Sequence, residues 1–289
     1  MQIIVNGLIQ GLLVAVLAVG FMSVYLPTRI FFVGLAGVYT LSPFVAWQVR
    51  SSGGPWWIAL FLAALASVAL SLACEWFNHR RLDRRGASSG AHLISSLGIF
   101  IVVVQIVAII WGNETKVLRT GIDSIYSKGG LTLTHSQLVG GTVSLVCLLG
   151  YYLWLRFSNL GLRFRALADN PVQLALFGFN IDRLRLIAFS ISGLLAGMSA
   201  ILMAYDVGFD PHAGLDAVLL AVVAVIIGGR SSFLAPIFGG ILLGLLRGEV
   251  VWYLSARWQE AATFLLVVIV LFLRPQGLLG SPLRLEADT

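Results

Sequence analysis

Residues 3–26 read IIVNGLIQGLLVAVLAVGFMSVYL, a stretch without a charged side chain. A membrane-spanning helix needs about 20 mainly apolar residues to cross a hydrocarbon core of about 30 Å, so this stretch predicts one crossing. The whole chain has the same character, because 58% of its 289 residues are hydrophobic, 11% are charged and the mean hydropathy is +0.93. Soluble domains carry about 25% charged residues, so the composition excludes a soluble globular protein.

Apolar runs recur along the rest of the chain. They are residues 30–47, 56–77, 93–111, 138–155, 186–204, 215–227, 233–253 and 261–273. Two of them are irregular, since 30–47 contains Pro43 and 215–227 is short for a crossing. Backbone groups in lipid must be bonded within their own segment, which favours helices. We therefore predict an all-α integral membrane protein, one bundle of about eight transmembrane helices over residues 1–289, and leave open one short re-entrant or broken helix.

Arginine residues concentrate in the segments 79–92, 156–185 and 228–232 and after the last run. They are Arg80, Arg81, Arg84, Arg85, Arg156, Arg163, Arg165, Arg183, Arg185, Arg230, Arg274 and Arg284. Loops rich in arginine stay in the cytoplasm, so this bias predicts a cytoplasmic C-terminus. The N-terminus is predicted outside if nine runs cross and inside if eight do. The same pattern accounts for the net charge of +6 without nucleic acid as a partner.

The sequence lacks the usual signs of catalysis. His79, His92, His135 and His212 are scattered over four connections without metal-ligand spacing, and neither a GxxxxGK[ST] loop nor a G-x-S-x-G elbow occurs. We therefore expect no enzyme, no catalytic or metal site and no cofactor. The alternative of a membrane-embedded enzyme would depend on Asp206, Asp210 and His212, which are the nearest thing to a cluster of reactive side chains.

The charged residues Glu75, Arg247 and Glu249 lie toward the ends of their runs, so a carboxylate for proton-coupled transport is not evident at mid-membrane. Small and uncharged polar positions are the candidates for a path taken by a neutral or zwitterionic solute, although packing contacts between helices would explain them as well. The candidate path positions are Gln10, Gly34, Thr40, Ser42, Gln105, Ser190 and Ser192.

Glycines four residues apart place small side chains on one helix face and predict close helix packing, either inside the bundle or between subunits. The motifs are Gly7-x3-Gly11, Gly193-x3-Gly197 and Gly240-x3-Gly244-x3-Gly248.

The segment 161–182 predicts one or two short amphipathic helices. Pro171 suits a first helical turn capped by Asn170 or Asp169, and Gly178 suits a helix end. The expected apolar face consists of Leu167, Leu174, Leu176 and Phe177. Such a helix lies on the membrane surface or docks into a groove of a partner, and the residues alone favour neither.

The same segment resembles a known family. It follows the pattern G-x-x-x-R-A-x-x-x-N-x-x-x-x-A-x-x-G. This pattern is similar to the cytoplasmic coupling segment of the branched-chain amino acid ABC transporter permeases, a family that also includes urea-type importers. Three further stretches resemble that family in the same order. They are RGAS at 85–88 with ISSLG at 94–98, AVVAVIIGGRSS at 221–232, and LRPQGLLG at 273–280.

The resemblance implies a permease of the bacterial inner membrane that pairs with a second permease, two cytoplasmic ATPases and a periplasmic solute-binding protein. It implies ATPase coupling through Gly161, Arg165, Ala166, Asn170, Ala175, Gly178 and Asp182. The solute is expected to be a branched-chain or other amino acid, with urea and short amides open, and the alternative is a facilitative channel without ATPases. The family's N-F-A-H-G-like stretch is replaced here by FVGLAG at 32–37, so no role of its Asn and His carries over.

Overall fold

The computed structural model describes residues 1–119, 124–128 and 131–280. The long helices are α1 (Gln2–Thr28), α2 (Leu35–Ser51), α3 (Trp56–Ala73), α5 (Ser89–Trp111), α6 (His135–Phe157), α9 (Ile181–Asp206), α10 (Ala213–Gly228), α11 (Ala235–Tyr253) and α12 (Gln259–Leu273). The short elements are the π-helical turn η1 (Cys74–His79), α4 (Arg80–Arg84), β1 (Ile125–Lys128), β2 (Leu131–Thr134), α7 (Asn159–Asp169), α8 (Pro171–Leu176) and the 3-10 turn η2 (Ala256–Trp258). The two strands form an antiparallel hairpin with Tyr126 opposite Leu133.

Seven helical segments of the described chain are long and apolar enough to cross a membrane, and α10 is a shorter apolar helix. The prediction of an all-α membrane bundle is therefore confirmed. The two runs predicted to be irregular are α2 and α10, with 17 and 16 residues. At 1.5 Å per residue each covers about 25 Å. Helix α2 continues through Pro43, so the chain is not broken there.

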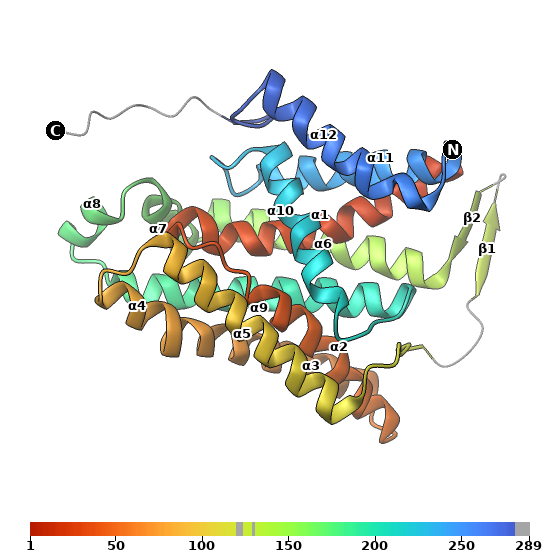
Figure 1. The fold of residues 1–289 in the computed structure, drawn as a ribbon, viewed down its shortest axis with the longest axis horizontal. Helices are drawn as coiled ribbons and strands as arrows, with labels where there is room; N and C mark the ends of the chain where they lie inside the picture. Colours follow the sequence, from red (N-terminus) through yellow and green to blue (C-terminus); the bar gives the residue numbers. More distant parts are fainter. Residues whose placement is uncertain (120–123, 129–130, 281–289) are drawn as a thin grey trace.

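The start of α1 and the last described residues, which follow α12, lie toward opposite ends of the bundle (Figure 1). Near the N-terminus, the side chain of Gln2 accepts a hydrogen bond from the backbone N–H of Thr132 in the hairpin. At the opposite end, the backbone N–H groups of Leu278 and Leu279 donate to the carbonyls of Ile227 and Gly228 at the end of α10, at 2.8 and 2.9 Å. Helix α9 ends beside the start of α6, next to the hairpin, where Ser136 donates to Asp206 at 2.7 Å. Helix α10 begins after α9 and ends at residues 278 and 279, so it crosses the bundle in the reverse direction.

The arginine-rich segments meet at one end of the molecule. Helices α4, α7 and α8 lie there together (Figure 1). Phe233, close after Arg230, stacks on Phe164 of α7 at 5.0 Å, and residues 278 and 279 bond to the end of α10, which brings the end of α12 to the same place. We call it the arginine-rich end, and the opposite one the hairpin end. The sequence predicted this segregation from the charge of the connecting segments alone.

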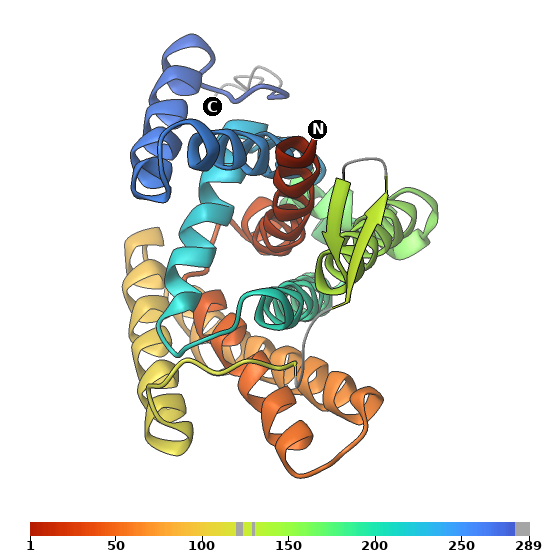
Figure 2. The same cartoon turned by 90° about the vertical axis from the view of Figure 1, so that its right-hand side faces the viewer.

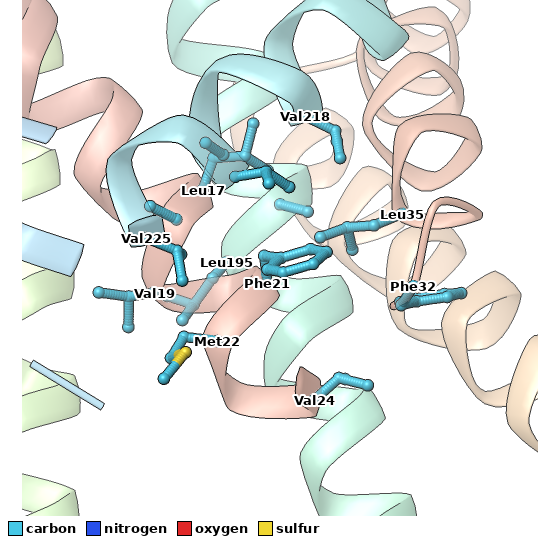
Figure 3. Close-up of a cluster of buried hydrophobic side chains, with 14 of the residues drawn as sticks. Leu17, Val19, Phe21, Met22, Val24, Phe32, Leu35, Leu195, Val218 and Val225 are labelled. Atoms are coloured by element: carbon cyan, nitrogen blue, oxygen red, sulfur yellow. The ribbon is translucent and has the colours of Figure 1, made fainter. Parts of the chain in front are cut away.

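Helix α1 is the centre of the bundle. It packs against α6, α9, α10 and α11, and the end-on view shows it surrounded by these helices (Figure 2). In Figure 3 its Phe21 and Met22 lie among Leu195 of α9 and Val218 and Val225 of α10. Phe21 and Met22 are buried because apolar neighbours surround the second half of α1.

Close backbone contact joins α1 to α11. A Cβ atom at Gly244 would lie 2.3 Å from the Cα of Gly11, a separation that real Cβ atoms do not show. At the neighbouring turn, a Cβ at Gly240 would lie 2.8 Å from the Cα of Ala15. The glycine motifs of α1 and α11 therefore serve packing inside this chain, as does that of α9, whose Gly193 faces Ser67 and Ser71 of α3.

We expect Gly244→Ala to force α1 and α11 apart, because the added methyl meets backbone and not a movable side chain. The expected loss is about 1–3 kcal/mol of stability, measured as a lower midpoint of thermal unfolding in detergent. The matched control is Gly98→Ala on α5, where a Cβ meets nothing within 4 Å. Equal midpoints for the two variants would contradict the proposed close contact.

Candidate functional site

The segment between α6 and α9 forms two short helices joined at a single capping residue. Asn170 ends α7, and its Oδ1 accepts hydrogen bonds from the backbone N–H groups of Val172 and Gln173, each at 3.0 Å. Pro171 occupies the first turn of α8, and Gly178 follows the helix with φ of 82°. The predicted cap, first-turn proline and glycine stop are all confirmed. Because φ of this sign suits glycine, the chain can turn sharply toward α9.

The predicted apolar face of this segment is divided between two directions. Leu167 and Leu174 pack inward against Leu184 of α9. Leu176 and Phe177 point outward, with 82% and 80% of their surface exposed. The inward pair anchors α8 to α9, and the outward pair forms an apolar tip that no described residue of the chain covers.

Helix α7 lies tightly against the end of α6. A Cβ at Gly161 would lie 2.4 Å from the carbonyl oxygen of Trp154, so only glycine allows this approach. A cavity of about 360 Å³ remains between α6, α7 and residues 231–234, lined in part by Arg156, Arg165 and Asp169.

The other predicted coupling residues take different places along the segment. Ala166 is half-buried, Ala175 is exposed on α8, and Asp182 lies in the first turn of α9, where it pairs with Arg80 of α4.

A network of charged side chains ties the start of α9 to η1 and α4. The guanidinium of Arg185 donates to both carboxylate oxygens of Glu75, at 2.8 and 3.2 Å, and also to Asp83. The Glu75 side chain is only 2% exposed. A buried carboxylate needs such a partner, and the two-pronged geometry is the strongest that arginine offers.

Two histidines extend this network into α5. Nε2 of His92 lies 3.0 Å from a carboxylate oxygen of Asp83, and the Nδ1 atoms of His79 and His92 are 3.1 Å apart. The sequence interpretation of four scattered histidines is therefore wrong for this pair. The pair was missed because the two residues belong to different helices, and only the return of the chain between α4 and α5 brings their rings together. Within the described residues, no group of three or more His, Cys, Asp or Glu could hold a metal ion.

The predicted path positions do not form one row. Thr40 and Ser42 of α2 are buried and donate to the carbonyls of Pro211 and Gly197, at 3.3 and 3.1 Å. Ser192 is buried, and its hydroxyl has no hydrogen-bond partner in the described part of the chain.

The remaining path positions make other contacts or are exposed. The backbone N–H of Gly34 donates to Ser96 at 2.6 Å, and Ser190 donates to the carbonyl of Leu186. Gln10 and Gln105 lie on exposed helix faces.

The residues of the enzyme alternative serve local structure instead. Asp206 accepts a hydrogen bond from Ser136 at 2.7 Å. Asp210 accepts from the backbone N–H groups of His212 and Ala213, at 2.8 and 3.1 Å, and so satisfies the start of α10. His212 shows no contact with either carboxylate beyond its backbone, so the three residues do not meet as a reactive cluster in the described structure.

Comparison with known proteins assigns the family. The model of the family described as branched-chain amino acid transport system / permease component matches residues 3–273. The chain belongs to that family. The expectation from the four resembling stretches is therefore confirmed over nearly the whole permease.

Two relatives show how far the likeness reaches. The permease is 24% identical to the high-affinity branched-chain amino acid transport system permease protein LivH of Escherichia coli strain K12, over 98% of this chain and 96% of LivH. It is 25% identical to the corresponding protein BraD of Pseudomonas aeruginosa, over the same shares of the two chains. A solved structure, PsaBC from Streptococcus pneumoniae in complex with Fab, superposes with a TM-score of 0.54 at 13% identity, covering 96% of this chain and 93% of that one. The last likeness concerns the fold alone.

We expect Arg185→Met to destabilise the permease, because it leaves the Glu75 carboxylate buried without its partner. The expected loss is about 3–5 kcal/mol, read from thermal unfolding in detergent. Replacing both partners, as in Glu75→Gln with Arg185→Met, is expected to restore most of that loss. A double variant as unstable as the single one would contradict this account, and Arg183→Met on the exposed side of α9 is the control.

Proposed function

We propose that this permease is the membrane subunit of an ATP-driven importer and forms the path for a small polar solute. The observation that carries the proposal is the apolar tip of Leu176 and Phe177. It projects from a short helix that is capped, anchored to α9 and placed at the arginine-rich end. An exposed apolar pair on a rigid helix suits insertion into a groove of another protein better than contact with water.

The partner at the tip is proposed to be an ATPase. The permease sequence has no phosphate-binding loop of its own, so the energy for uptake must come from other subunits. Two ATPases, a second permease of the same family and a periplasmic solute-binding protein complete the proposed importer. In this assembly, residues 1–289 form one permease domain, and the segment 156–185 carries the coupling residues from Gly161 to Asp182.

The orientation follows from the charge of the two ends. The arginine-rich end is proposed to face the cytoplasm of a bacterial cell, since loops rich in arginine remain on that side. The C-terminus then lies inside and the N-terminus and hairpin outside. This places α8 on the side where ATP is available.

The solute is proposed to be a branched-chain or another amino acid. The support comes from the names of the two relatives that span nearly the whole chain. Thr40, Ser42 and Ser192 are the proposed path positions with buried hydroxyl groups. Uncharged hydroxyls suit a zwitterion that must be released again. Gln10 and Gln105, on exposed faces, would join the path only where a second permease covers them.

We expect Leu176→Asp combined with Phe177→Asp to abolish ATPase docking without unfolding the permease, because neither side chain packs inside the chain. The tagged permease, purified from native membranes in mild detergent, should lose co-eluting ATPase activity, and uptake should fall more than about tenfold. The thermal midpoint should stay that of the wild type. The control, Leu176→Met with Phe177→Tyr, keeps the tip largely apolar and should keep the ATPase. Retention of the ATPase by the double Asp variant would refute the docking role.

Uptake should also require ATP. Vesicles that contain the purified assembly are expected to accumulate solute against a gradient with ATP and to show no flux with a non-hydrolysable analogue. A facilitative channel would instead equilibrate the solute in both conditions, at equal rates. Equal rates of solute flux with ATP and with the analogue would therefore contradict the importer and support the channel alternative.

A further inference from the structure

We propose that the network of Glu75, Asp83, Arg185, His79 and His92 is a positioning device. It would transmit displacement of α8 to α2, which carries two of the path positions. This inference rests on the proposed function, since it presumes that an ATPase moves α8.

The first link joins α8 to α9. Only residues 177–180 separate the two helices, and Leu174 packs on Leu184. Asn180 accepts a hydrogen bond from the backbone N–H of Arg183 at 3.1 Å and so holds the first turn of α9 in place. A displacement of α8 therefore moves the start of α9 with it.

The second link joins α9 to η1 and α4. Asp182 and Arg185 are three residues apart, so they lie on one face of α9. Asp182 pairs with Arg80, and Arg185 pairs with Glu75 and Asp83. Charged contacts on that face hold α9 to the end of α3 against sliding and rotation, because several bonds would have to break together.

The third link reaches the interior. Asp83 contacts His92 of α5, and the rings of His92 and His79 stack with centroids 5.4 Å apart. The His79 ring, fully buried, packs edge-on against Phe32 at 5.5 Å and also against Phe189 of α9. Phe32 stands three residues before α2, and the backbone N–H of Gly34 is bonded to Ser96 of α5. The route therefore ends at the start of the helix that carries Thr40 and Ser42.

The π-helical turn η1 and the start of α4 are unusual for their unpaired polar atoms. Six buried side-chain atoms of the described chain lack a hydrogen-bond partner, and three of them belong to consecutive residues: Nδ2 of Asn78, Nε2 of His79 and Nε of Arg80. Buried polar atoms are normally bonded, and π-helical turns occur often at functional sites. We take η1 and the start of α4 as the place where the proposed displacement changes the structure, because unpaired polar atoms gather there.

The test separates transmission from simple stability. The assembly is reconstituted in vesicles, and solute uptake and ATP hydrolysis are measured together for Asp83→Asn and for the Glu75→Gln with Arg185→Met pair. Asp83 is partly exposed, so its neutral variant should fold, and the paired variant leaves no lone buried charge. The controls are Arg183→Met on the same helix and Asp83→Glu, which keeps the carboxylate.

We expect both network variants to retain docked ATPase and hydrolysis, while solute transported per ATP falls about tenfold. Both controls should keep the wild-type ratio. A wild-type ratio in both network variants would show that the network is only structural and would overturn the inference. Loss of docked ATPase would overturn it too, because the network would then merely hold α8 in shape. If the wild-type permease bound no ATPase, the proposed function itself would be wrong.

Discussion

The bundle depends on how closely α1 approaches its neighbours. Lipid tails are as apolar as leucine, so burying apolar side chains does little to drive helices together, and contact at short range must hold them. Gly11 and Gly244 permit backbone contact between α1 and α11, and Gly193 permits it between α9 and α3. Since α1 also packs on α6, α9 and α10, one helix sets the spacing of the four long helices around it.

The two ends of the bundle, on either side of this closely packed centre, carry different groups. The arginine-rich end carries the ion pairs among Glu75, Asp83 and Arg185, the stacked histidines and the apolar tip of α8. The apolar tip is anchored to α9, and the charge network joins the same helix to η1, α4 and α5. A force applied at α8 would therefore act on several helices at once, whereas the packing around α1 resists separation at the centre.

Much of the fold could be predicted from the sequence, because the bilayer allows few kinds of backbone structure. A charge-free run such as residues 3–26 has no alternative to a helix in hydrocarbon, and arginine between such runs marks one side. The cap at Asn170, the proline after it and the turn at Gly178 were readable for a local reason, since each acts on its own backbone neighbours. The hairpin was not foreseen, because its strands are only 4 residues each within a polar connection.

The sequence by itself determined the membrane class, the helices, the segregation of charge and, through its motifs, the family. The tertiary structure alone decided which side chains meet. Leu174 turned inward while Leu176 turned outward, and Arg185 reached Glu75 across 110 residues of sequence. The physical reason is that composition and periodicity act within one helix, whereas ion pairs, stacked rings and glycine contacts depend on which helices lie side by side. That arrangement follows from packing around α1, which no single stretch of the sequence encodes.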